Sequence, residues 1–146
     1  MSNDIFSLVG SALNAQNARM GAIASNLANI DSITPPGTEP YRAHEIVFAA
    51  NPVEGGDAGV SDGSDTAPDL GVMVAGTVQS NAAPKTSYDP SSPYADADGY
   101  VTGSNVSQVD QMVDLIDSQN SYAASVALLQ QASRLDKQMI SSFQLS

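Results

Sequence analysis

The chain has 146 residues, of which 16 are acidic and five are basic, so its formal net charge is −11, and it contains no cysteine. This charge argues against binding to nucleic-acid phosphates or to anionic lipid, because both interactions depend on Lys and Arg. The lack of cysteine excludes disulfides, thiolate metal sites and thiol catalysis. The sequence also has no run of about 18 apolar residues that would predict a membrane span.

Large apolar residues are scarce, since Leu, Ile, Val and Phe together number 31. That share is close to the roughly 20% below which highly charged chains tend to be disordered. We therefore expect a weak core, which partner subunits complete. The first positive charge is Arg19, so we expect no cleavable signal peptide with a charged start.

Helix-breaking residues divide the chain into three parts. All eight prolines lie between Pro35 and Pro93, and nine of the 11 glycines lie between Gly37 and Gly103. The expected fold is mainly α with a small β part, in which long terminal helices form a coiled-coil-like core. Its expected parts are an N-terminal helical segment, a turn-rich β segment and a C-terminal helical segment: residues 1–34, 35–104 and 105–146.

In the first part we predict a helix over residues 5–30, preceded by the possible N-cap residues Ser2, Asn3 and Asp4. Residues at steps of three and four form a seam that is apolar except for one glutamine: Phe6, Val9, Leu13, Gln16, Met20, Ile23, Leu27 and Ile30. This spacing is typical of a coiled-coil helix. The other faces carry small polar residues and almost no charge, which favours close packing against several helices, although one amphipathic helix of a small bundle would also fit.

The central part reads as short strands and loops. Residues 41–48 alternate in part, and Val72, Val74, Val78 and their neighbours form a β-branched run beside Gly71 and Gly76. Asp98-Gly99 is a turn signal before another short run. Residues 51–69 are acidic, glycine-rich and nearly free of large apolar groups, which predicts a mobile loop.

In the last part we predict a longer helix over residues 106–143, because this range contains neither Pro nor Gly. Its stripe changes phase near Ala127, which predicts two different partners for its two halves. Asn120 lies on the stripe, where it either fixes the register or is half-exposed. The members of the stripe are Val106, Val109, Val113, Ile116, Asn120, Ala123 and Ala127, followed by Leu128, Ala132, Leu135, Met139 and Phe143. An antiparallel pair of helices with unequal lengths leaves a stretch uncovered, and we expect another chain to bury it.

The residues that carry chemistry form no catalytic pattern. His44 is the one histidine, lies in a strand-like run and has no nucleophile motif to serve. The acids Asp57, Asp62, Asp65 and Asp69 miss the alternate spacing of an EF-hand, so a solvated acidic loop is favoured over a calcium site. We expect no enzymatic activity, no cofactor and no metal.

Three blocks of the sequence resemble a known family. SALNAQNARMGAIASNLANIDS (residues 11–32) resembles the N-terminal signature of bacterial flagellar rod and hook proteins. GTEPYRAHEIVF (37–48) and KTSYDPSSPYADADGYV (85–101) look like the basal-body rod proteins of the FlgC type. DQMVDLIDSQNSYAASVALLQ (110–130) resembles the terminal helix of that family.

The resemblance implies a structural subunit that polymerises into the hollow drive shaft of the flagellum and transmits motor torque to the hook and filament. It implies a location in the basal body across the periplasm, and export by the flagellar type III apparatus without a cleaved signal. The implied partners are copies of the chain, other rod subunits and the export apparatus, with no nucleic acid and no membrane insertion.

In such a polymer we expect the seam of the first helix to pack against Val109, Val113, Ile116 and Leu128, within and between subunits. Asn26 and Asn29 are expected to make hydrogen bonds between helices of the assembled tube. The expected assembly interface comprises Phe6, Val9, Leu13, Gln16, Met20, Ile23, Asn26, Leu27, Asn29, Val109, Val113, Ile116, Asn120, Leu128 and Leu135.

Other functions remain open at this point. A soluble helical adaptor or accessory protein of a secretion system would bind a partner helix reversibly and form no tube. A calcium-dependent or hydrolytic enzyme would use the acidic loop, and neutralising its acids would then abolish function. Within the family, a sibling proximal-rod subunit is the nearest alternative.

Overall fold

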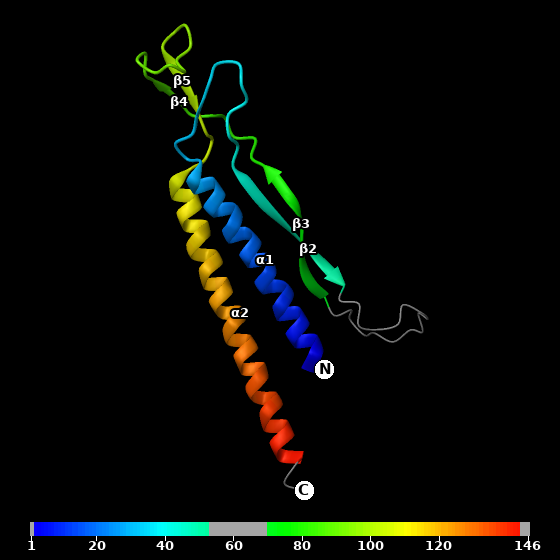
Figure 1. Cartoon of the computed structure of the whole chain (residues 1–146). Coiled ribbons are helices and arrows are strands. Elements are labelled where there is room, and N and C mark those ends of the chain that lie inside the picture. Colours follow the sequence, from blue (N-terminus) through cyan, green and yellow to red (C-terminus); the bar gives the residue numbers. More distant parts are fainter. Residues whose placement is uncertain (1, 53–69, 144–146) are drawn as a thin grey trace, which may run out of the picture.

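The computed structural model describes residues 2–52 and 70–143, which form two helices and five strands (Figure 1). The helices confirm the mainly α fold expected from the sequence. In chain order the elements are α1 (Ser2–Ala28), β1 (Ile33–Thr34), β2 (His44–Pro52), β3 (Leu70–Gln79), β4 (Thr86–Tyr88), β5 (Tyr100–Gly103) and α2 (Gln108–Phe143).

The two helices run antiparallel and side by side, with both chain ends near the same end of the molecule (Figure 1). Their 27 and 36 residues correspond to lengths of about 40 and 54 Å. The expected ranges were right to within three residues at each end. Ser107 precedes α2, and its carbonyl accepts the amide of Gln111 at 3.1 Å, while Asp110 in the first turn suits the positive end of the helix dipole.

Strands β2 and β3 form an antiparallel hairpin that lies along α1, on the side away from α2 (Figure 1). The pairing runs from His44 opposite Gln79 to Pro52 opposite Leu70. Its register shifts between Val47 and Phe48, which is a bulge of the kind that bends and twists a hairpin. Helix α1 is therefore the middle layer, between α2 and the hairpin.

The remaining strands form a small sheet beyond the end of the helix pair (Figure 1). Its order is β1-β5-β4, and both neighbours of β5 are antiparallel to it. The turn before β5 depends on Gly99, whose φ of 84° favours glycine. The predicted turn at Asp98-Gly99 is thus confirmed.

The predicted loop over residues 51–69 was wrong at its start, because Asn51 and Pro52 belong to β2. The rest of that range, including the four acids considered for calcium, lies outside the described residues. Burial is described for residues 5–50 and for residues 71–142. Few apolar side chains in these two ranges are buried: Val9, Ala15, Ile23, Ala43, Val101 and Val106. Neither helix, over its described length, is apolar enough to cross a membrane.

Candidate assembly interface

Helix α2 contacts α1 through a face made mostly of small and polar residues. Gln111 is 8% exposed and Ser118 is fully buried, and the other members are half-buried. The members recur at alternating steps of four and three, the spacing of helices that pack at a shallow angle. This inner seam consists of Gln111, Leu115, Ser118, Tyr122, Ser125, Leu129 and Ala132.

The opposite face of α2 carries the part of the predicted apolar stripe that runs from Val109 to Ala127. These side chains are exposed, with 70% exposure at Val109, 61% at Val113 and 59% at Ile116. Two other predicted members differ, since Val106 is buried before α2 begins and Ala132 lies in the inner seam. Each residue of the exposed stripe is two positions along the chain from a residue of the inner seam, which places it about 200° away around the helix. The stripe therefore points away from α1. We call Val109, Val113, Ile116, Asn120, Ala123 and Ala127 the outer seam.

The prediction that Val109, Val113, Ile116 and Leu128 pack against the first helix within the subunit was therefore wrong, because all four are 59–70% exposed. The α1 residues of the expected interface pack within the subunit: Val9 and Ile23 are buried, and the others are half-buried, namely Phe6, Leu13, Gln16, Met20 and Leu27. Helix α1 contacts α2, β2 and β3, and the exposed outer seam is not the face that covers these residues. Packing of Val109, Val113 and Ile116 between subunits stays a prediction.

The second half of α2 shows the consequence of the change in phase. Leu128 and Leu135 are 62% and 51% exposed, as are Met139 and Ile140 at 52% and 54%. Leu128 and Leu135 lie about 80–100° to one side of the outer seam around the helix axis. The exposed apolar surface thus changes direction after Ala127, and the prediction of two partners for the two halves remains untested.

Asn26 has a role within the subunit that the sequence analysis did not predict. Its side chain is 1% exposed. Its Oδ1 accepts the amide of His44 at 2.8 Å and the hydroxyl of Tyr41 at 3.1 Å. Its Nδ2 donates to the carbonyl of His44 at 2.9 Å and to Oε1 of Gln111 at 2.8 Å. The Asn26 amide thus pairs with β2 as a neighbouring strand would, and it joins α1, β2 and α2 with its full hydrogen-bonding capacity.

Asn29 also serves its own subunit. Its Nδ2 donates to the carbonyl of Ser25 at 2.9 Å, and its carbonyl accepts the hydroxyl of Ser32 at 2.9 Å. Carbonyls at the end of a helix have no partner within the helix, so these bonds close the last turn of α1. Asn26 thus bonds to the other helix within one chain, through Gln111, whereas the expected bonds of Asn29 between helices of the tube stay a prediction.

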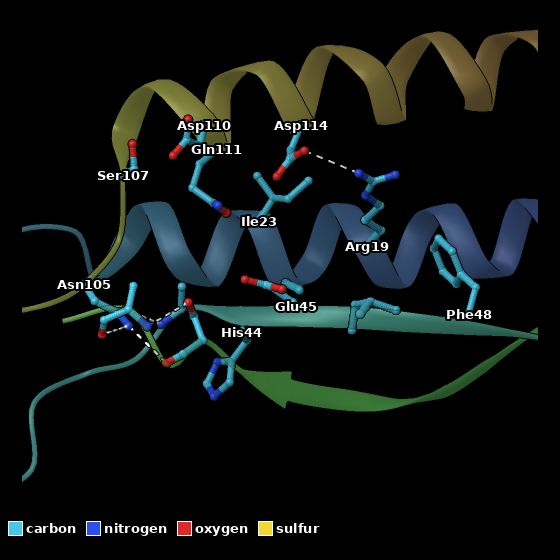
Figure 2. Close-up of a pocket in the computed structure, with 15 residues that line it drawn as sticks. Arg19, Ile23, His44, Glu45, Phe48, Asn105, Ser107, Asp110, Gln111 and Asp114 are labelled. Atoms are coloured by element: carbon cyan, nitrogen blue, oxygen red, sulfur yellow. Dashed lines mark hydrogen bonds and ion pairs between the residues drawn. The ribbon is translucent and has the colours of Figure 1, made fainter. Parts of the chain in front are cut away.

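A groove of about 560 Å³ lies between α2 and β2, over α1 (Figure 2). Its carboxylates are those of Glu45, Asp110 and Asp114, and Nη2 of Arg19 lies 3.3 Å from Oδ1 of Asp114. The imidazole of His44 points away from α2 (Figure 2). Within the described residues no three His, Asp or Glu side chains gather closely enough to hold a metal ion. The groove is an acidic surface feature next to an ion pair between partly exposed side chains.

The inner seam is the part of the site that sequence reasoning missed. Its heptad spacing is visible in the sequence, but Gln111, Ser118 and Ser125 are polar, so hydropathy did not mark that face as buried. Asn26 could have been found from its place on the same face of α1 as Ile23, three residues earlier. A buried amide between apolar positions is expected to have partners.

The chain matches two families of known proteins. The family described as flagella basal body rod protein matches residues 9–35, and the family described as flagellar basal body rod FlgEFG protein C-terminal matches residues 97–142. Among curated relatives, the flagellar basal-body rod protein FlgC of Escherichia coli O6:H1 is 43% identical over 126 residues, 86% of each chain. FlgC of Salmonella typhimurium is 41% identical over the same share, and FlgC of Borreliella burgdorferi is 33% identical over 84% of each chain.

Proposed function

Since the chain belongs to the flagellar basal-body rod proteins of the FlgC type and is a structural subunit of the rod, we propose that it polymerises into the hollow shaft that transmits motor torque to the hook and filament. It acts by assembly rather than by catalysis. Its partners are copies of itself, other rod subunits and the type III export apparatus. It lies in the basal body across the periplasm, which it reaches without a cleaved signal peptide.

The exposed outer seam of α2 is the observation that carries this proposal. Contiguous apolar surface on a soluble chain marks an interaction site. Full burial of a Val or Ile side chain contributes about 1.5–3 kcal/mol, so burying the exposed parts of Val109, Val113 and Ile116 contributes roughly 3–6 kcal/mol per subunit. A contribution of this size, repeated at every subunit, supports a polymer of chains whose own cores are small.

A soluble adaptor that binds one helix reversibly is the second candidate, because the same seam would fit a single partner helix. The two functions differ in what the seam supports. An adaptor would form a discrete complex, whereas a rod subunit is retained in basal bodies isolated from cells. Detection of the chain in purified basal bodies therefore separates the two.

The test is the double variant Val113→Gln/Ile116→Gln. Glutamine favours helix at least as well as Val or Ile, and both side chains are exposed in the subunit, so α2 should form as before. We expect export without incorporation: few basal bodies in electron micrographs and loss of swimming. Gln119→Ala, at another exposed position of α2, is the matched control and should swim normally.

Circular dichroism of the purified double variant completes this test. An unchanged helical signal together with loss of rods supports assembly through the outer seam. Normal rods and swimming in the double variant would show that the seam is not an assembly surface and would refute the proposal.

A further inference from the structure

The face of α1 that neither α2 nor the hairpin covers has the same spacing as the outer seam. Its members are small, uncharged and exposed, except for the half-buried Gly10. A Cβ atom built at Gly10 or at Gly21 would meet nothing within 4 Å, so the face is open along its length. We call Gly10, Asn14, Asn17, Gly21, Ala24 and Ala28 the free face of α1.

The two faces match in length and in shape. Each covers 18 residue steps, about 27 Å of helix, and each follows the steps four, three, four, three, four. The outer seam presents larger side chains at Val109, Val113 and Ile116, whereas the free face presents glycine, alanine and asparagine. Large side chains on one helix opposite small ones on the other allow close contact between two helices.

Charge also favours this match. The chain carries a net charge of −11, so surfaces of two copies tend to repel, and Asp110 and Asp117 lie beside the outer seam on α2. The free face of α1 carries no ionisable side chain. The one cation of the α1 helix, Arg19, is turned towards α2 instead, with Nη2 and Nη1 3.3 and 3.6 Å from the carboxylates of Asp114 and Asp117.

We propose that the outer seam of α2 docks on the free face of α1 of a second copy, with the two helices antiparallel. This pairing places Asn120 opposite Asn17, so that the two amides can bond to each other. It places Val109 opposite Ala28, Val113 opposite Ala24 and Ile116 opposite Gly21. In the parallel alternative, Val113 and Ile116 would face Asn14 and Asn17, and Asn120 would face Gly21, which puts apolar groups against amides.

The symmetry of an open assembly gives the same orientation independently. The contact is heterologous, because it joins two different faces of the chain, and such contacts build rings or filaments in which every copy points the same way. Since α1 and α2 are antiparallel within one copy, α2 of one copy is then antiparallel to α1 of its neighbour. This inference rests on the proposed function and adds to it the pair of faces that joins neighbouring copies.

Disulfide cross-linking tests the pairing, because the chain has no cysteine of its own. The variant Gly21→Cys/Ile116→Cys replaces the native chain in the source bacterium, and basal bodies are isolated and mildly oxidised. Positions 21 and 116 lie on faces turned away from each other's helix, so a disulfide between them must join two copies. We expect a ladder of multimers of the chain on a non-reducing gel.

The matched control is Asn17→Cys/Ile116→Cys, which represents the parallel register. Positions 17 and 21 are about 6 Å apart along the helix, and a disulfide requires Cα atoms about 4.4–6.8 Å apart. The antiparallel pair should therefore cross-link at least tenfold more than the control. Ala24→Cys/Val113→Cys repeats the antiparallel register at a second place, so that poor assembly of one variant does not decide the result.

Three positive results would overturn the proposal, and so would one negative result. The positive results are preferential cross-linking of the parallel pair, dimers formed by Ile116→Cys alone, and cross-links to a protein other than this chain. Absence of multimers from both antiparallel pairs in normally formed basal bodies would overturn it as well. Failure of the proposed function would be recognised separately, because the native chain itself would then be missing from purified basal bodies.

Discussion

Replacement of Asn26 by alanine should open the junction between the two helices and the hairpin. The Asn26 amide bonds to both the N–H and the carbonyl of His44, the first residue of β2, and also to Gln111 of α2. Alanine removes all of these partners at once. Tyr41 keeps a partner, because its hydroxyl also lies 3.1 Å from Nδ1 of His44.

The size of the effect follows from the groups that lose a partner. Three groups remain without their bond: the amide and the carbonyl of His44, and Oε1 of Gln111. A buried group left unpaired costs roughly 1–3 kcal/mol; Oε1 of Gln111 loses a buried bond, whereas the two His44 groups lose part-buried ones. The free energy of unfolding should therefore fall by about 3 kcal/mol, a large part of the stability that a chain with so small a core can have.

Amide hydrogen exchange of the purified subunit measures this effect directly, because the His44 amide is itself one of the bonded groups. A loss of 3 kcal/mol corresponds to roughly a hundredfold loss of protection. Asn29→Ala is the control in the same block of sequence; its bond is at the surface, and its change should stay within about 0.5 kcal/mol. Protection of His44 within threefold of the parent in Asn26→Ala would refute the reasoning.

Two further predictions concern a surface ion pair and a turn. Arg19→Met keeps the aliphatic stem but removes the contacts with Asp114 and Asp117; because these groups are 30–64% exposed, the loss should be under about 1 kcal/mol and should shrink in 1 M salt, as denaturant midpoints at two salt concentrations will show. If the loss of stability in Arg19→Met were the same in high salt, packing of the side chain rather than its charge would account for it. Gly99→Ala should destabilise the subunit more than Gly37→Ala does, since both residues have a φ of 84° but only at Gly99 would a new Cβ lie 2.9 Å from Tyr88. Equal melting temperatures of the two variants would contradict the steric argument.

The order of the elements was predictable because its signals are local. Proline and glycine exclude helix from the centre of the chain, and the steps of three and four mark the helices at both ends. The strands were harder to bound, since only half of β2 shows alternation and its last residues, Asn51 and Pro52, resemble the start of a loop. Pairing with Leu70 and Gly71 across the hairpin extends β2 through them.

The interface was predicted less well, because two stripes with the same spacing run along α2. Hydropathy selects the stripe of Val109, Val113 and Ile116 as the buried one. In the subunit, α1 instead packs against the stripe of Gln111 and Ser118. The polar stripe can be buried because Gln111 bonds to Asn26, and because a small side chain at Ser118 lets two helices approach closely.

The sequence by itself determined the two helices, the turn-rich centre and the presence of an apolar seam on each helix. Only the tertiary structure decided which face of α2 meets α1 and that Asn26 holds β2 against the helix pair. The physical reason is that periodicity reports which residues share a face, whereas the partner of that face depends on hydrogen bonds and shape between residues as far apart as Asn26 and Gln111. The apolar face of α2 remains available to another chain because the polar face already meets α1.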